Sequence, residues 1–352
     1  MSDIQKLLQT AAHYRASDLY VSAGTKPVVR VNGRLFPIDE HSILDKATAE
    51  SLLLEVMNDR LKEKLKETSD LDFSIEVKGL ARFRVNIFVQ RKGLSGVFRL
   101  IPEHPLSLEE LKLPEQVKRL SQLKQGLVLI TGPTGCGKSS TLAALIKEIN
   151  QAKAQHIITI EDPIEFLHEN EQSIIEQREV GLHTASFDRA LRASLREDPD
   201  VILVGEMRDL ETMSLALTAA ETGHLVFSTL HTSGAAKSIH RIIDVFPPDQ
   251  QAQIRTQLAE NLAAIVWQKL IPSEVEMVNG TKRIAACEIL MNNHAVKNMI
   301  RKGNTHQINS VIETSRSEGM QTMQQSLRAL HQAQIISDET FNQHSHHSAP
   351  DA

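Results

Sequence analysis

The sequence lacks the residues that mark several protein classes. Its 352 residues include two cysteines, Cys136 and Cys287, which are too few for a disulfide framework or a cysteine-rich metal site. No apolar run approaches the roughly 18 residues that a membrane-spanning helix needs. Residues 1–20 are polar and amphipathic, without the basic segment and apolar stretch of a signal peptide. We therefore expect a cytoplasmic protein in a reducing compartment.

An excess of positive charge is also missing. The formal net charge is -5, so the chain lacks the basic balance with which nucleic-acid binders displace counterions from phosphates. We do not expect a nucleic acid as its main partner. Hydrophobic residues make up 41% and charged residues 24%, as in ordinary globular proteins. The length is enough for two or three domains, because single cores stop growing at roughly 250–300 residues.

Residues 1–101 predict a compact domain of helices and strands. Apolar residues recur at helical spacing over 4–12, and a stretch rich in Leu and Lys predicts a helix over about 47–67. Strand-like runs cover residues 19–22, 28–31, 35–38, 71–77, 81–90 and 94–101. This mixture favours a small α+β domain.

The strand predicted over 81–90 has two chemically different faces. The alternation of a strand places one set of side chains in the core, namely Ala81, Phe83, Val85, Ile87 and Val89. The opposite set is Arg82, Arg84, Asn86 and Gln90. The second face is therefore basic, and it either contacts an anionic ligand or is simply solvated.

Beyond a proline-containing linker over 102–118, the pattern changes to α/β. Short apolar strands are predicted over 127–131, 156–160, 201–204 and 225–229, with helices between them at about 138–150, 187–195 and 210–221. Such alternation predicts a parallel sheet covered by helices on both faces. We expect one domain over 119–338.

The last hundred residues predict helices and then a tail. From about 248 onward the chain reads as mostly helical, with amphipathic stretches around 249–270 and 320–334. Residues 339–352 contain His344, His346 and His347 but almost no apolar residues. We expect this tail to be disordered rather than to form a metal site.

A phosphate-binding motif, G-x-x-x-x-G-K-[ST], lies between the strand LVLIT and the helix KSSTLAALIKEIN. That context is the one this motif requires. Backbone N–H groups and the helix N-terminus face the phosphates in such loops, while Lys138 reaches the β- and γ-phosphates and Ser139 holds Mg²⁺. For Cys136 a neutral role is favoured over a redox switch, because the loop binds through its backbone. The expected ATP contacts are Gly132, Pro133, Thr134, Gly135, Cys136, Gly137, Lys138, Ser139 and Ser140.

An acidic residue follows a second apolar strand. In DPDVILVGE, Glu206 stands at the carboxyl end of the strand, where an enzyme of this kind needs a carboxylate to order water directly or through the metal. A capping role for the next helix is the alternative. Asp200 begins the same strand and therefore lies at the wrong end for catalysis.

The strand ending in TIEDPIE offers a further carboxylate. Glu161 is the candidate for contact with water or magnesium, because open α/β sheets bind ligands at the carboxyl ends of their strands. Asp162 and Glu165 compete with it. A purely structural turn at Asp162 and Pro163 is a third interpretation.

Two histidines flank the strand in TGHLVFSTLHT. His231 follows the strand and is placed to touch a γ-phosphate, whereas His224 precedes it and is expected to pack or cap. A lone histidine is more often structural, so spacing alone leaves the role of His231 open.

These four elements occur in the order GPTGCGKS, TIEDPIE, LREDPDVILVGEMRD and TGHLVFSTLHT. They resemble the Walker A, Asp box, Walker B and His box of the secretion and type IV pilus ATPases, and within them the retraction ATPases of the PilT family. The resemblance covers nearly the whole chain. It implies a PAS-like N-terminal domain beside a RecA-like core that hydrolyses ATP.

The resemblance also implies roles for individual residues. Glu206 would be the catalytic acid, Glu161 its Asp-box companion and His231 the His-box residue. Arginines from the N-terminal domain complete the family's site, and Arg84 and Arg99 match them, with Arg82 as an alternate for Arg84. A cation arriving as domains close would stabilise charge on the γ-phosphate.

The same resemblance implies partners and location. The family forms homohexameric rings that work on an inner-membrane pilus platform protein, so we expect a cytoplasmic protein held at the inner membrane by partners. A paralogous retraction ATPase is a further candidate partner. Residues 295–302, AVKNMIRK, resemble a C-terminal motif linked to retraction but differ at Lys297, Met299 and Lys302. An accessory PilU-type paralogue and a type II/IV secretion ATPase therefore stay open. A nucleotide-dependent regulatory binding module is an alternative of another class.

Overall fold

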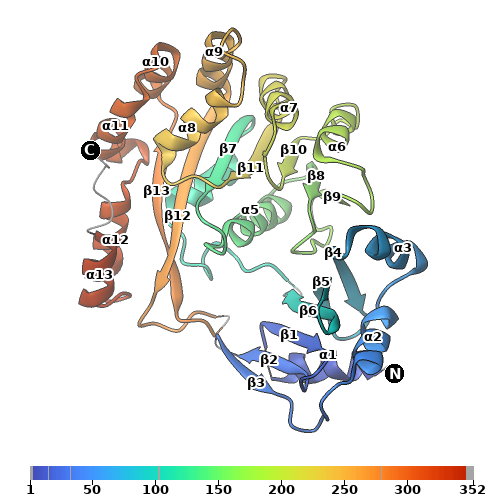
Figure 1. Ribbon diagram of the computed structural model, residues 1–352. Coiled ribbons are helices and arrows are strands. Elements are labelled where there is room, and N and C mark those ends of the chain that lie inside the picture. The colour runs from blue at the N-terminus through green and yellow to red at the C-terminus, as the bar shows by residue number, and fades with distance from the viewer. Residues whose placement is uncertain (1–2, 15, 32, 102–103, 279, 346–352) are drawn as a thin grey trace. The chain divides into compact units, whose positions relative to one another are not determined.

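A computed structural model describes residues 3–14, 16–31, 33–101, 104–278 and 280–345 (Figure 1). The chain divides into two compact units. The N-terminal unit comprises Met1–His104 together with Pro163–Leu167, and the core unit comprises Pro105–Asp162 with His168–Ala352. A short segment that interrupts the core sequence thus packs with the N-terminal unit.

The N-terminal unit is an antiparallel sheet of six strands in the order β3-β2-β1-β6-β5-β4. Its strands are β1 (Asp18–Ser22), β2 (Val28–Val31), β3 (Arg34–Pro37), β4 (Asp70–Val77), β5 (Ala81–Gln90) and β6 (Gly93–Ile101). Its helices are α1 (Asp3–His13), α2 (Lys46–Glu55) and α3 (Asp59–Thr68). The six predicted strands are therefore present.

The long helix predicted over 47–67 is two helices. Asn58 ends the run, because its side chain accepts a hydrogen bond from Leu61 N and so caps the N-terminus of α3. The predicted faces of β5 are confirmed for Phe83, Val85 and Ile87, which are buried. The prediction was wrong for Val89, which is 55% exposed near the end of the strand.

The core unit contains a seven-stranded sheet in the order β13-β12-β7-β11-β10-β8-β9, which Figure 1 shows in sequence across the unit. Its strands are β7 (Gly126–Thr131), β8 (His156–Glu161), β9 (Ile174–Glu179), β10 (Val201–Val204), β11 (Leu225–Leu230), β12 (Leu262–Pro272) and β13 (Arg283–Met291). Six of these strands run parallel, and β13 is antiparallel to β12 at one edge.

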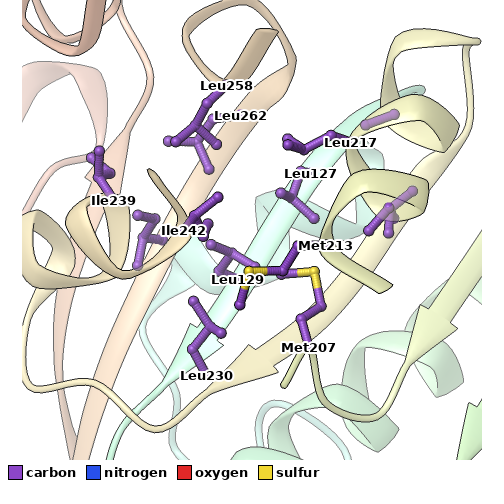
Figure 2. Close-up of a cluster of buried hydrophobic side chains, with 14 of the residues drawn as sticks. Leu127, Leu129, Met207, Met213, Leu217, Leu230, Ile239, Ile242, Leu258 and Leu262 are labelled. Atoms are coloured by element: carbon purple, nitrogen blue, oxygen red, sulfur yellow. The ribbon is translucent and has the colours of Figure 1, made fainter. Parts of the chain in front are cut away.

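Helices cover both faces of this sheet. Those of the core unit are α4 (Glu115–Lys118), α5 (Lys138–Ala152), α6 (Phe187–Ser194), α7 (Leu210–Glu221), α8 (Ala235–Asp244), α9 (Gln251–Asn261), α10 (His294–Lys302), α11 (Ile308–Thr314), α12 (Met323–Gln332) and α13 (Asp338–Ser345). Alternate residues of β7 enter two different clusters. Leu127 and Leu129 pack with helices α7 to α9, as Figure 2 shows, whereas Val128 and Ile130 pack with α5. The predicted parallel sheet with two covered faces is confirmed.

The structure corrects the predicted helical C-terminal part. Residues 262–272 are the strand β12, not the continuation of a helix from 249, and they form an antiparallel pair with β13. The run LAAIVWQKLI is buried on both faces, and periodicity alone does not separate such a strand from a buried helix. Strand β9 was also not predicted.

The predicted linker and tail are more ordered than expected. Residues 115–118 of the linker form α4, and the helix α13 extends through residue 345, where a disordered tail was predicted from 339. Phe341 stacks on His331 with ring centroids 4.8 Å apart, so a single aromatic contact helps to order this helix. Residues 102–103 and 346–352 lie outside the described residues. Among the described helices, none is long and apolar enough to cross a membrane.

Candidate functional site

The strand order brings four sequence-predicted motifs to one edge of the core sheet. Strands β7, β11, β10 and β8 are consecutive neighbours and all run parallel. Their carboxyl ends therefore lie side by side, and each leads directly into one motif. These are the phosphate-binding loop after β7, His231 after β11, Glu206 after β10 and Glu161 at the end of β8. Parallel sheets bind ligands at such an edge.

The loop after β7 has the backbone of a phosphate cradle. Gly135 and Gly137 have φ values of 76° and 90°, a left-handed conformation that favours glycine, and Gly137 leads into α5. The loop tip from Pro133 to Gly135 is exposed. Lys138 is 8% exposed, and its Nζ donates to Gly132 O at 2.9 Å and to Pro133 O at 3.1 Å. The lysine thus helps to hold the loop itself.

Glu206 lies in a charged cluster after β10. One carboxylate oxygen lies 2.7 Å from Arg208 Nη2, and the other lies 3.5 Å from His231 Nε2. The carboxylate is 20% exposed, and His231 is 40% exposed. A partly buried acid with one face open to solvent is suited to orienting water. Arg208 was not among the residues predicted from the sequence. Its position two residues after Glu206 was the one signal in the sequence that could have indicated this contact.

Glu161 is the acid that the structure holds at the end of β8. Its Oε1 accepts hydrogen bonds from Thr159 Oγ1 at 2.7 Å and from Gln177 Nε2 at 3.3 Å. Its two competitors are placed differently. Asp162 is exposed, and Glu165 belongs to the segment that packs with the N-terminal unit. The structure therefore favours Glu161 at this edge of the core sheet.

The predicted arginines lie together within the N-terminal unit. Arg84 of β5 and Arg99 of β6 are directly opposite across the sheet. Arg84 Nη2 lies 2.6 Å from Asp72 Oδ2, and its Nη1 lies 3.6 Å from Glu165 Oε1. Arg99, which is 65% exposed, bonds Asp18 at 2.9 Å. Their carboxylate partners offset the repulsion between the two cations.

The alternate, Arg82, donates from Nη2 to Ser74 Oγ at 2.6 Å on the same face of β5. This face is therefore basic but supplied with polar partners, as the alternation predicted.

The opposite end of the core sheet holds the two polar residues expected to be structural. Asp200 Oδ2 accepts from His156 N at 2.9 Å, and the Asp200 N–H donates to His156 O at 2.9 Å. His224 Nδ1 lies 2.9 Å from Ala219 O at the end of α7. Both residues satisfy backbone groups between elements, so the structural interpretation is confirmed.

Sequence reasoning missed a basic cavity beside α6. The cavity has a volume of about 460 Å³, and its lining includes four arginines and one histidine. Arg178 pairs with Glu197 at 3.1 Å. Most of this charge comes from α6 and the loop after it, where Arg189, Arg192 and Arg196 stand at i, i+3 and i+7. This helical spacing of basic residues was the signal in the sequence that could have indicated the cavity. The basic side chains are Arg178, His183, Arg189, Arg192 and Arg196.

Burial controls the chemistry of the loop cysteine. Cys136 is 3% exposed, and burial raises the pKa of its thiol. Burial likewise raises the pKa of the Cys287 thiol to about 12. Both cysteines are therefore thiols rather than reactive thiolates at neutral pH, which agrees with a neutral role.

The residues at this edge fit a magnesium ion bound with a nucleotide. Among the described residues, no three His, Cys, Asp or Glu side chains gather as a metal site. Mg²⁺ does not need such a cage, because it keeps several waters and is held by one or two protein oxygens together with phosphates. Ser139, in the first turn of α5, offers one hydroxyl next to the loop.

Comparison with known proteins places these features in a family. The family model for the type II/IV secretion system protein matches residues 1–346. The chain belongs to this family. One relative of this type II/IV secretion system protein is the pilus retraction ATPase PilT of Pseudomonas aeruginosa, which is 49% identical over 337 residues and covers 96% of each chain. The pilus ATPase PilU of the same organism is 42% identical over 329 residues, covering 94% of this chain and 85% of PilU.

A solved structure resembles this type II/IV secretion system protein over its whole length. The crystal structure of the pilus retraction motor PilT with bound ADP has a TM-score of 0.89 and 43% sequence identity. The match covers 100% of this chain and 98% of the other. The predicted fold class, an N-terminal α+β domain followed by an α/β P-loop core, is confirmed.

Proposed function

We propose that this chain is an ATPase whose hydrolysis of ATP drives type IV pilus retraction, and hence twitching motility, as a ring motor. The observation that carries the proposal is the alignment of a phosphate-binding loop with the carboxylate of Glu206 and the ring of His231 at one edge of the sheet. The likeness to PilT extends over both units, so it includes the parts that a motor moves as well as the part that binds nucleotide.

Nucleotide binding changes the partners of Lys138. Its Nζ now bonds two carbonyls of its own loop, and a triphosphate offers stronger, charged acceptors in the same place. The lysine then contacts the β- and γ-phosphates while loop N–H groups surround them. Ser139 holds Mg²⁺, which supplies charge neutralisation on the phosphates when bound.

Hydrolysis requires a water in line with the γ-phosphate. Glu206 accepts a hydrogen bond from that water and takes up its proton as the bond from the water oxygen to the γ-phosphorus forms. The bond from the γ-phosphorus to the bridging oxygen breaks at the same time, and ADP leaves with that oxygen. Arg208 and His231 hold the carboxylate from two sides, so its orientation is fixed before the water arrives. Glu161 orients the same water or a metal-bound water from the neighbouring strand, and His231 also contacts the γ-phosphate.

Arg84 and Arg99 add positive charge near the γ-phosphate to that of Lys138. A guanidinium is always protonated and offers a fork of donors, which suits it to charge that spreads over phosphate oxygens. Arg84 must then exchange its Asp72 and Glu165 partners for the nucleotide. Arg84→Ala should lower kcat by about 10³-fold, while ADP affinity changes little; a turnover near wild type would remove Arg84 from the site.

The working assembly is a homohexamer held at the inner membrane by a pilus platform protein, with a paralogous retraction ATPase as a further partner. The N-terminal unit and the core unit are each compact, and rotation of one against the other around a ring is the motion that hydrolysis drives. The net charge of -5 supports a protein partner over a nucleic acid.

Two linked experiments test the proposal. Lys138→Ala should abolish ATP turnover by the purified full-length chain, because a loop without its lysine loses its main contact with the γ-phosphate. In cells, deletion of the gene should leave excess surface pili and no twitching, and the Lys138→Ala gene should not restore motility. Cells without pili would instead indicate an extension motor, and normal twitching would indicate an accessory paralogue.

A further inference from the structure

A buried glutamine lies directly beneath the phosphate-binding loop. Gln268 of β12 has no exposed surface. The pairing of β12 with β7 ends at Trp267 opposite Thr131, so Gln268 lies beside the point where the loop begins. Its Nε2 donates to Cys136 O at 2.8 Å, and its Oε1 accepts from Thr141 Oγ1 at 3.0 Å. One side chain thus joins the loop to the first turn of α5.

The bond to Cys136 fixes the direction of an N–H group that a phosphate needs. The peptide unit between Cys136 and Gly137 is planar and trans, so its C=O and its N–H point in opposite directions. Because Gln268 holds the Cys136 carbonyl on the strand side, the Gly137 N–H faces away from the strand, into the loop. Loop N–H groups directed in this way are the donors that a nucleotide phosphate accepts.

The amide of Gln268 has only one orientation that satisfies its partners. The Cys136 carbonyl accepts and does not donate, so it requires the NH2 end of the amide. The Thr141 hydroxyl then donates to the remaining oxygen. A flipped amide would place two acceptors against each other at a fully buried position, which costs free energy. The network therefore holds the loop in one conformation before any ligand binds.

The strand that carries Gln268 is itself held in place. Gln268 pairs with Cys287 of β13, whose N–H donates to Ser326 Oγ at 3.0 Å and whose carbonyl accepts from Gln321 Nε2 at 2.9 Å. On the other side, its main-chain oxygen abuts Gly132, where a Cβ would collide with it. The backbone at Gln268 is therefore held in place on both sides. Glycine is needed at position 132 because it allows this close approach and because it adopts a φ of 144°.

We propose that Gln268 is a positioning residue for the nucleotide, which preforms the phosphate-binding loop by orienting the peptide between Cys136 and Gly137. This inference rests on the proposed ATPase function. A buried glutamine is costly unless its hydrogen bonds are all made, and leucine or methionine would fill the same volume without that cost. The polar side chain is therefore explained by its two partners rather than by packing.

The test uses the full-length chain with Gln268→Met, which keeps the volume and removes both polar ends. The dissociation constant of ADP with Mg²⁺ should rise by about 10- to 100-fold, because the loop must be ordered by the ligand instead of by the protein. The KM for ATP should rise with it while kcat per folded molecule changes little, since the loop contacts the phosphates before and during the reaction.

Ser326→Ala is the matched control. It also removes a buried hydrogen bond from this strand pair, at Cys287, but on the side away from the loop. It should lower the melting temperature without changing ADP affinity. If Gln268 had a purely structural role, Gln268→Met would also lower the melting temperature without changing ADP affinity. That result would overturn the inference.

Thr141→Val provides a second variant of nearly unchanged shape. It releases only Oε1 of Gln268, so ADP affinity should fall in the same direction but by less, about threefold. If the wild-type chain binds no ADP, the proposed function fails. If the wild-type chain binds ADP and both Gln268→Met and Thr141→Val bind it equally well, the proposed function stands and the role of Gln268 is refuted.

Discussion

Each end of the core sheet carries an acid and a histidine, but the bonding partners of these side chains differ between the two ends. At the amino ends of the strands, Asp200 and His224 bond backbone groups of neighbouring elements. At the carboxyl ends, Glu206 contacts both Arg208 and His231, and the side chains of Glu206 and His231 stay partly exposed. The difference follows from the direction of the strands, because loops that leave a parallel sheet at its carboxyl edge are free to surround a ligand. Position on the sheet, not residue type, therefore distinguishes Asp200, which bonds backbone groups, from Glu206, for which we propose a catalytic role.

The strongest test of this difference replaces one acid at each end of the sheet, Glu206 and Asp200. Glu206→Gln should lower kcat by about a thousandfold, because an amide does not accept a proton from water, and ADP binding should persist. Asp200→Ala should cost about 1 kcal/mol of stability through its lost backbone bond and leave kcat per folded molecule unchanged. Turnover assays and thermal melts of the two variants check this. Equal losses of kcat would mean that the two ends of the sheet do not differ in role.

Replacing His231 and His224 should reveal the same difference between the two ends of the sheet, with a smaller loss of kcat. His231→Ala should lower kcat by roughly tenfold, because Glu206 would keep Arg208 but lose its second positioning contact. His224→Ala should affect only stability, by about 1 kcal/mol. The measurement is kcat at saturating ATP, with the folded fraction set by circular dichroism. A larger kcat loss in His224→Ala than in His231→Ala would reverse the assignment.

The carboxyl edge was predictable because its signals are local. The glycine spacing of the loop, the strand before it and the helix after it lie within one short stretch of sequence, and the chain direction fixes which end of each strand carries Glu206 and His231. The family resemblance added the arginines on β5 and β6. No local pattern in the sequence gives the distance from these arginines to a nucleotide.

What the sequence did not reveal depends on residues far apart in the chain. Gln268 contacts Thr141, which lies 127 positions earlier in the chain, and no motif near Gln268 in the sequence marks it as part of a site. Strand β12 was read as helix because a run that is apolar on both faces has no strand period to detect. Helix α13 was missed because its contacts are with residues of α12, such as the stacking of Phe341 on His331 and the bond of Asp338 to His331, and its own composition does not indicate them.

A third histidine, His168, sharpens the comparison because its side chain is only partly exposed and we propose no catalytic role for it. Burial, and next the charge of Lys147, lowers its pKa from 6.5 to about 4. The folded chain thus binds its proton less readily than the unfolded chain between these two values. The stabilising effect of a neutral His168 is fully present above pH 6.5 and is lost as the pH falls toward 4. Over that range the wild-type protein should lose about 2 kcal/mol of stability on this account.

His168→Gln removes the titrating group, so the stability of the variant should fall less than that of the wild type between pH 6.5 and 4. Denaturant unfolding of both chains at pH 8 first measures the effect of the substitution on packing, because His168 is neutral there in the folded and unfolded states alike. The difference between the two chains at pH 4.5, corrected by the difference at pH 8, isolates the contribution of the proton. If the corrected difference is zero, His168 is solvated in the folded chain. It would then resemble the open histidine at the carboxyl edge rather than a buried residue of the core.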